Sequence, residues 1–462
     1  MLLVGVFAKG AGLVIAVLVA RFLGPHAMGL FALLFSIAIL LETFISVGMS
    51  DSLVRDVAAR PDQAANLYLS ALKLVAWISL VPATLLALAA FLIANDSGTR
   101  ASLMVIAIST PVSGAFVVSQ AVLQGSERVL FLTWVTFLAR ILSLALLAYV
   151  LYRGAGLEAA FASRLLFQAL SVAVFFPAYW RDRKKSSGVY TNRDLLTRSV
   201  PFALNLAVRE LGVRLPSFLL PVTVGLGPAG VFDSANRIRS TLGMTIGASI
   251  VGLMPSFARN FGQSGSRFDG LIGYSVKYMC LAMSAVATVI TLLAKGIIDL
   301  LFGPAFAGAS QPLQILVWSQ VLVAVDAVLQ QAMLAAGATY PAIRNSTVGV
   351  LGQLALILLL SAALGLPGVA LALLLSSALT LALDLRYVVR NVTAIPIRRF
   401  AVGPLAAAFF VASLMLVVDH VSFALRLLVA IGSWGAAMVL FRVLPREELR
   451  FMIQLVTSGR AK

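Results

Sequence analysis

The sequence predicts an all-α polytopic membrane protein with 12–14 transmembrane helices. We expect two six-helix bundles, related as parallel repeats around a central cavity, plus up to two extra C-terminal helices. The 462-residue chain is 61% hydrophobic and only 11% charged, whereas soluble domains are about 45–50% apolar and about 25% charged. Its apolar runs lie near the roughly 20 residues that a helix needs to cross a bilayer. The sequence lacks the alternating segments of about 10 residues that build a transmembrane β-barrel.

The apolar runs between loop signals predict the helices in chain order. The last four runs are short or closely spaced, so twelve or thirteen crossings remain alternatives to fourteen. The predicted spans are 2–20, 29–47, 71–94, 102–123, 130–152, 157–180, 200–224, 230–254, 271–293, 312–334, 347–363, 369–387, 401–418 and 425–443.

Lys and Arg residues are distributed unevenly between the two sets of loops. With the N-terminus inside, the cytoplasmic loops, helix ends and tail hold 22 of the 35 Lys and Arg residues, and the opposite side holds 5. Because cytoplasmic loops are enriched in these residues, the bias predicts that both termini lie in the cytoplasm. The net charge of +17 then serves topology and contact with anionic lipids, and we expect no nucleic-acid partner.

Residues that carry enzymatic chemistry are scarce in this sequence. Cys280 is the single cysteine, and His26 and His420 are the two histidines. The sequence therefore lacks the cysteines for a disulfide framework or a thiol metal site. With two histidines, it also offers little for a Ser-His-Asp catalytic site. The outer loops are all short, so none of them folds into a catalytic domain. We expect no enzymatic activity, no cofactor and no metal.

Two pairs of segments recur in order along the chain. RFLGPHAMGLF (21–31) resembles VGLGPAGVF (224–232) at an offset of 203, and QAVLQGSERVL (120–130) resembles QAMLAAGATYP (331–341) at an offset of 211. Both pairs lie at the same helix ordinal, which predicts two six-helix units. The expected domains are an N-terminal bundle (1–180), a basic cytoplasmic linker (181–199), a C-terminal bundle (200–387), two additional helices (388–443) and a cytoplasmic tail (444–462).

The motifs ARFLGPHAMGLFAL, QAVLQGSERV, LLFGPAFAGASQPLQILVW and QAMLAAG, followed by YPAIRNS and LGLPGVALA, resemble the polysaccharide transporter family of bacterial flippases. That family belongs to the multidrug/oligosaccharidyl-lipid/polysaccharide (MOP) superfamily. The resemblance implies two helix bundles around a cavity that move undecaprenyl-pyrophosphate-linked oligosaccharides across the cytoplasmic membrane. The related peptidoglycan-precursor flippases carry an arginine at the end of their first helix, which matches Arg21.

Ionisable residues inside the predicted helices are the most informative about function. Each costs about 2.5–3.5 kcal/mol at a helix centre, so such residues usually face a bundle interior or water. They sum to a cationic interior, which suits an anionic substrate. Lys277 and Asp384 are expected at the interface. The residues predicted to bind substrate are Lys9, Arg21, Arg140, Arg164, Arg209, Arg214, Arg237 and Arg239, and the candidates for ion coupling are Glu42, Asp233 and Asp326.

The predicted helices 200–224 and 230–254 carry the sharpest signal. Glu210 and Arg214 are four residues apart and predict an ion pair, as do Asp233 and Arg237. Arg209 is left unmatched within its own helix. Because the guanidinium group is a rigid fork of donors that suits phosphate oxygens, the excess arginine favours a diphosphate headgroup. The competing interpretation makes these residues structural ion pairs.

The leading hypothesis is a flippase for undecaprenyl-pyrophosphate-linked repeat units in the bacterial cytoplasmic (inner) membrane, serving synthesis of O-antigen, capsule or exopolysaccharide. A multidrug exporter of the same fold is one alternative, but it should line its cavity with acidic residues. A membrane-embedded glycan polymerase or ligase is another, but such enzymes usually need a sizeable external loop. The expected partners are the lipid-linked glycan and the bilayer, together with a polysaccharide polymerase and a chain-length regulator.

Overall fold

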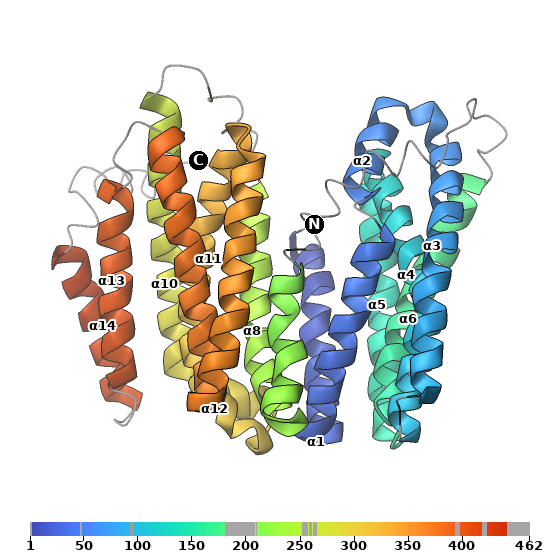
Figure 1. Cartoon of the computed structure of the whole chain (residues 1–462), viewed down its shortest axis with the longest axis horizontal. Coiled ribbons are helices and arrows are strands. Elements are labelled where there is room, and N and C mark those ends of the chain that lie inside the picture. The colour runs from blue at the N-terminus through green and yellow to red at the C-terminus, as the bar shows by residue number, and fades with distance from the viewer. Residues whose placement is uncertain are drawn as a thin grey trace, which may run out of the picture. The chain divides into compact units, whose positions relative to one another are not determined.

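The protein is helical in the computed structural model, with no strand among the residues that the structure describes (Figure 1). These are residues 2–46, 49–92, 94, 96–180, 208, 210–251, 257, 261, 266–392, 398–417 and 423–440. The helices are α1 (Leu2–Ser46), α2 (Met49–Ala59), α3 (Ala64–Leu92), α4 (Ser97–Gly125), α5 (Val129–Tyr152), α6 (Glu158–Trp180), α8 (Leu226–Val251), α10 (Ser266–Leu301), α11 (Ser310–Ala335), α12 (Thr339–Asn391), α13 (Arg398–Val417) and α14 (Phe423–Leu440). A further helix covers 210–223, and short 3₁₀ helices cover Pro61–Gln63 and Pro304–Ala309.

Eight helices of the described chain are long and apolar enough to cross a membrane. Two of these helices are longer than a single crossing requires. Helix α1 has 45 residues and α12 has 53, which correspond to roughly 68 and 80 Å of helix, whereas the hydrocarbon core of a bilayer is about 30 Å thick. Each contains a glycine outside the helical conformation, Gly24 with φ 80° and Gly365 with φ 62°. The chain reverses direction at the first of these (Figure 1). With α1 and α12 each supplying two crossings, these eight helices account for ten crossings. The predicted 12–14 also requires crossings by some of α8, α13, α14 and the helix over 210–223.

Contacts between the two limbs of α12 show the second reversal. Nδ2 of Asn345 donates a hydrogen bond to Oδ1 of Asp384 at 2.8 Å. A Cβ placed on Gly349 would meet the Thr380 hydroxyl at 2.1 Å. Both pairs are centred on the same point of the chain, beside Gly365. The limbs therefore form an antiparallel helical hairpin, and a residue near the start of α12 faces one near its end.

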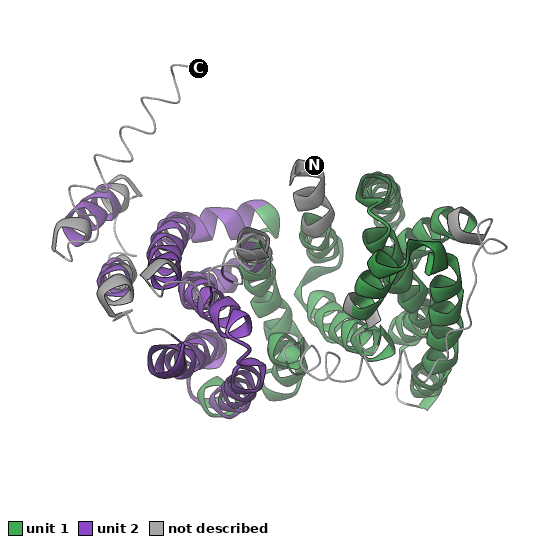
Figure 2. Cartoon of the chain, turned by 90° about the horizontal axis from the view of Figure 1, so that it is seen from above, with its two compact units in different colours: residues 1–241, 301–306, 357–362 green, residues 242–300, 307–356, 363–462 purple. Residues whose placement is uncertain are grey.

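The chain divides into two compact units, coloured separately in Figure 2. Unit 1 comprises 1–241, 301–306 and 357–362, and unit 2 comprises 242–300, 307–356 and 363–462. The predicted linker lies outside the described residues, and the division falls within α8, so the predicted domain boundaries stay predictions. Most of the ionisable residues predicted inside helices belong to unit 1.

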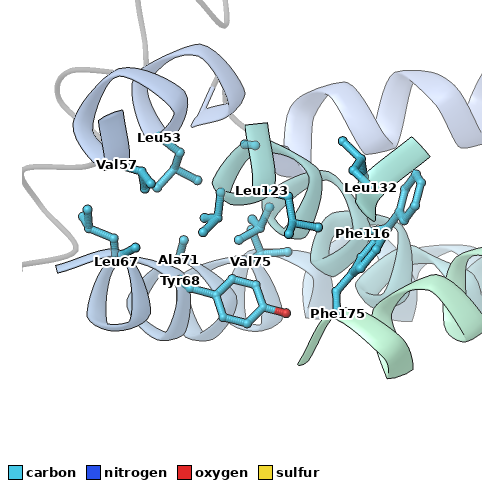
Figure 3. Close-up of a cluster of buried hydrophobic side chains, with 14 of the residues drawn as sticks. Leu53, Val57, Leu67, Tyr68, Ala71, Val75, Phe116, Leu123, Leu132 and Phe175 are labelled. Carbon is cyan, nitrogen blue, oxygen red and sulfur yellow. The ribbon is translucent and has the colours of Figure 1, made fainter. Parts of the chain in front are cut away.

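A hydrophobic core fastens the helices α2 to α6 of unit 1 to one another (Figure 3). Leu53 and Val57 of α2 face Tyr68 of α3, and Phe116 of α4 and Phe175 of α6 are buried in the same cluster. The Tyr68 hydroxyl, which would be costly to bury without a partner, shares a hydrogen bond with Ser119 at 2.9 Å. This core also contains residues of α1, α5 and α6, the helices that carry Glu42, Arg140 and Arg164.

Helices α4 and α11, which carry the second predicted repeat, end in the same backbone geometry. Arg128 N donates to Leu123 O at 3.0 Å, and Glu127 has a positive φ of 58°. At the end of α11, Ala338 N donates to Met333 O at 2.8 Å, and the residue before it is a glycine with a φ of 75°. Both ends are closed by an αL residue. The two caps lie 210 residues apart, one fewer than the offset read from the sequence.

Candidate functional site

Three ion pairs come together in unit 1. Arg164 of α6 pairs with Glu42 of α1. On α8, Nε of Arg237 donates to Oδ2 of Asp233 at 2.9 Å, and in the helix over 210–223 the Arg214 Nε lies 3.5 Å from a carboxylate oxygen of Glu210. The sequence predicted the two pairs within single helices. It gave no signal for the first pair, whose members are 122 residues apart.

One aromatic ring joins these three pairs. The guanidinium carbons of Arg237, Arg164 and Arg214 lie 4.7, 5.2 and 5.6 Å from the ring centroid of Phe35 on α1. Arg237 also lies 5.2 Å from the centroid of Phe31, one helical turn earlier. The π face of a ring attracts a cation, and stacking leaves the N–H edge of a guanidinium group open to an acceptor. Sequence reasoning missed both phenylalanines, although their spacing of four on a helix beside a basic cluster was visible.

Two more arginines complete what we call the arginine cluster, Arg140, Arg164, Arg214, Arg237 and Arg239. Arg140 of α5 lies 3.4 Å from the Phe167 ring centroid, and its buried Nε meets no hydrogen-bond acceptor in the described chain. Nε of Arg239 donates to Oδ1 of Asn236 at 2.8 Å. Within the described residues neither of these two forms an ion pair with a carboxylate.

The charges of the cluster act on one another. Arg140 interacts electrostatically with Arg164 and Glu42, and Arg214 interacts with Arg237 and Arg239. Five guanidinium groups therefore stand against the three carboxylates of the ion pairs, and the surplus is positive. The paired side chains keep between 6% and 28% of their surface exposed. An anion is the ligand that this arrangement attracts.

The first predicted repeat brings α1 and α8 into direct contact beside the cluster. A Cβ on Gly29 would lie 1.9 Å from the Leu226 carbonyl oxygen, and a Cβ on Gly230 would lie 1.9 Å from the Pro25 carbonyl oxygen. The contact is reciprocal, and only glycine allows backbones to approach so closely. Phe31 and Phe35 follow this crossing on α1, and Arg237 follows it on α8, so the crossing sets their separation.

Of the remaining predicted residues, one is exposed in unit 1, one belongs to unit 2, and two have side chains outside the described residues. Arg21 is exposed, and its Nε donates to the Leu301 carbonyl oxygen at 2.8 Å. Asp326 belongs to α11 of unit 2, where Nε2 of Gln330 donates to its Oδ2 at 2.9 Å. Arg209 lies outside the described residues, as does the side chain of Lys9.

Asp384 and Lys277, which were expected at the membrane interface, are both buried within the protein, at 0% and 5% exposure. Their place at the interface stays a prediction. The hairpin of α12 explains the burial of Asp384, because it folds the end of the helix against its beginning. Hydropathy places a charged residue only by its distance from the end of a predicted span. It gives no information about a partner such as Asn345 in the other limb of the hairpin.

Comparison with known proteins adds family and fold. The family model described as "Polysaccharide biosynthesis protein" matches residues 1–261. No curated protein matches the chain significantly. Among solved structures, the lipid II flippase MurJ in an inward closed conformation is similar with a TM-score of 0.71 at 14% identity, covering 95% of this chain and 98% of its own.

Multidrug transporters share the fold as well. An inward-facing MATE family transporter of the MOP superfamily is similar with a TM-score of 0.68 at 18% identity, covering 84% of this chain and 95% of its own. A MOP superfamily transporter from Pyrococcus furiosus, described by the reverse polarity of its binding pocket, has a TM-score of 0.61 at 19% identity, with coverage of 84% and 93%. The chain thus shares its fold with these membrane transporters, in line with its eight helices that are long and apolar enough to cross a membrane. The chain belongs to the polysaccharide biosynthesis protein family and has the fold of MurJ and the MATE transporters.

Proposed function

We propose that this protein flips undecaprenyl-pyrophosphate-linked oligosaccharide repeat units across the bacterial cytoplasmic membrane for synthesis of O-antigen, capsule or exopolysaccharide. Membership of the polysaccharide biosynthesis family supports the glycan, and likeness to a lipid II flippase supports a lipid-linked substrate. The observation that carries the proposal is the surplus of guanidinium groups over carboxylates inside unit 1.

In this proposal the arginine cluster holds the pyrophosphate. Arg140 and Arg239 form no ion pair with a carboxylate among the described residues, so they contact the phosphate oxygens without first breaking an ion pair. Arg164, Arg214 and Arg237 keep their carboxylates and donate from their remaining N–H groups. The predicted roles of Lys9, Arg21 and Arg209 remain part of the proposal. The glycan crosses in water, the polyprenyl tail stays in lipid, and the bundles alternate access between the two faces.

The predicted ion-coupling residues divide into two kinds. Glu42 and Asp233 each already have an arginine partner, which competes with any cation for the same carboxylate. Asp326 accepts a hydrogen bond from the neutral amide of Gln330 and remains a candidate for coupling. We also place the protein in the inner membrane with both termini cytoplasmic, where a polymerase and a chain-length regulator would be its partners.

The alternatives make opposite demands on the cluster. A multidrug exporter for cationic compounds would need a net acidic cavity, and the positive surplus repels such compounds. A glycan polymerase or ligase would also bind a polyprenyl diphosphate with arginine, but its product would be a longer glycan on the outer face. The location of the unpolymerised repeat unit therefore separates these functions.

The test replaces the two arginines outside ion pairs, as Arg140→Gln and Arg239→Gln, in cells that lack the native protein. We expect the full-length lipid-linked repeat unit to accumulate on the inner leaflet. Loss of one charged hydrogen bond to phosphate costs about 1.5–3 kcal/mol, roughly ten- to a hundredfold in affinity. Leaflet position is measured in oriented membrane vesicles by the fraction of glycan that an added glycosidase can reach.

Arg100→Gln is the matched control. Its Nη2 donates to the Ala94 carbonyl oxygen and its guanidinium carbon lies 6.0 Å from the Phe91 ring centroid, so it has similar contacts outside the cluster. Normal flipping by both cluster variants would refute the pyrophosphate site. Accumulation of single repeat units on the outer leaflet would instead favour the polymerase.

A further inference from the structure

One side of the second limb of α12 is exposed and ends in two arginines. Residues three and four apart share one side of a helix, so the exposed residues of this limb form a single stripe. They are Leu375, Ala378, Leu379, Ala382, Arg386, Val389 and Arg390. The buried residues Leu381, Asp384 and Val388 lie on the opposite side of the limb. An exposed apolar surface on a helix that is long and apolar enough to cross a membrane is typical of contact with lipid.

The length of the hairpin sets the depth of its arginines. Residues 345–383 contain no Asp, Glu, Lys or Arg. Arg344 lies 21 residues before the turn at Gly365 and Arg386 lies 21 residues after it, which is about 32 Å of helix on each limb. The hydrocarbon core is about 30 Å thick, so the uncharged part of the hairpin fills it and puts both arginines at headgroup level. Tyr340, one turn before Arg344, is 77% exposed and is an aromatic residue of the kind found at that level.

Arg386 and Arg390 are like charges on the same side of one helix. Like charges four residues apart destabilise a helix. Neither arginine forms an ion pair within the described residues. The one acidic residue of α12, Asp384, is 0% exposed and accepts a hydrogen bond from Asn345 in the other limb. The two guanidinium groups therefore need an anion from outside this helix.

Arg344, at the same depth on the first limb, is used differently. Its Nε and Nη2 donate to Oδ1 of Asn345 at 3.3 and 3.2 Å, and Nδ2 of the same amide donates to Asp384. This guanidinium group is thus engaged within the hairpin. The exposed pair on the second limb is the part of this end of α12 that is arranged to bind a ligand.

We infer that Arg386 and Arg390 bind the phosphate of an anionic phospholipid in the leaflet at this end of the hairpin. The phosphate oxygens accept N–H groups from both guanidinium groups, and the acyl chains lie along Leu379 and Leu375. A zwitterionic lipid brings its own cation beside the two arginines, so the site prefers phosphatidylglycerol to phosphatidylcholine. The predicted topology makes this the cytoplasmic leaflet. The two arginines belong to unit 2, whereas the arginine cluster belongs to unit 1.

Lipid binding to the purified full-length protein in detergent tests the site. Native mass spectrometry gives the association constant of the first lipid bound, in separate titrations with phosphatidylglycerol and phosphatidylcholine. We expect Arg386→Gln and Arg390→Gln each to weaken phosphatidylglycerol binding about fivefold, which is the contribution of one basic residue beside an anionic lipid surface. Binding of phosphatidylcholine should not change, and the double variant should lose the preference for phosphatidylglycerol. Unchanged binding of phosphatidylglycerol in both single variants overturns the inference.

Arg153→Gln is the matched control, because Arg153 is an exposed arginine at the end of α5 with no second arginine one turn away. An equal loss of phosphatidylglycerol in this control shows a response to total charge and overturns the inference. Farnesyl pyrophosphate probes the other source of a lipid phosphate. If it displaces phosphatidylglycerol from the unmodified protein, and the double variant no longer binds it, the pair is a polyprenyl diphosphate site and the inference is wrong. Variants are compared at matched thermal unfolding midpoints.

Discussion

The guanidinium carbon of Arg237 lies 4.7 Å from the ring centroid of Phe35, and two more arginines share that ring. A cation over an aromatic face contributes about 0.5–1 kcal/mol at an exposed site and about 2 kcal/mol when desolvated. Phe35 therefore offsets part of the repulsion among three guanidinium groups. It does so without occupying their N–H donors, which a fourth carboxylate would do.

Phe35→Leu tests this role, since leucine keeps most of the apolar volume and loses the π face. We expect the affinity for inorganic pyrophosphate, measured by calorimetry, to fall about three- to thirtyfold, because the three arginines separate when the ring is lost. Phe44→Leu, on the same helix at a side chain that is 60% exposed, should leave affinity unchanged. Equal affinities for both variants would show that Phe35 only fills space.

The effects on stability of replacing Glu42 and Arg164, which form an ion pair, should be strongly coupled. Glu42→Gln leaves a guanidinium group that is only 11% exposed without its carboxylate, and breaking a buried pair costs about 3–5 kcal/mol. We expect each of Glu42→Gln and Arg164→Gln to lower the thermal unfolding midpoint, and the double variant to lose clearly less than the sum. Additive losses in this cycle would mean that the two side chains do not stabilise each other.

The crossing of α1 and α8 should not tolerate a methyl group. Gly29→Ala and Gly230→Ala each place a Cβ 1.9 Å from a carbonyl oxygen of the other helix, so the helices must separate. Overpacking of this kind costs about 1–3 kcal/mol, and we expect lower unfolding midpoints with impaired flipping. Gly12→Ala is the control on α1, because nothing lies within 4 Å of its added Cβ. Unchanged midpoints in both test variants would contradict the close crossing.

The two repeat-related helix ends predict unequal responses to substitution. Gly337→Ala puts a Cβ on a residue with a φ of 75° and should cost about 1–2 kcal/mol of stability. Glu127, at the equivalent position of α4, already carries that strain with a φ of 58°. Glu127→Gly should therefore cost less than about 0.5 kcal/mol, measured by denaturation in detergent. A loss as large as that of Gly337→Ala would contradict the shared geometry.

Local spacing predicted part of the candidate site. Asp233 and Arg237 are four residues apart on one helix, and so are Glu210 and Arg214, which is why their pairing could be read from the sequence. Arg140 and Arg164 were recognised as charged residues inside spans, but their positions carry no information about a partner. The stacking on Phe35 was missed because a phenylalanine in an apolar run is indistinguishable from a lipid-facing residue.

Asp326 and Asp384 show the same limit in unit 2. Asp326 was predicted as a candidate for ion coupling, since an acid in an apolar helix needs a reason to be there. Asp384 was expected at the interface because it stands near the end of a span. The turn at Gly365, a single residue with φ 62°, reverses α12 and places Asp384 against Asn345. The partner that a side chain meets in a hairpin depends on this turn and not on local hydropathy.

By itself, the sequence determined the class of the protein, because composition and the length of apolar runs decide whether a chain dissolves in water or in lipid. It also determined the excess of positive charge inside the helices and the two pairs formed within single helices, which depend only on residues one turn apart. Tertiary structure alone decided which distant polar groups meet, as in Glu42 with Arg164 and Asn345 with Asp384. Those contacts depend on how helices cross, and the crossings are set by backbone approach at a few glycines, a property that no periodicity along the chain encodes.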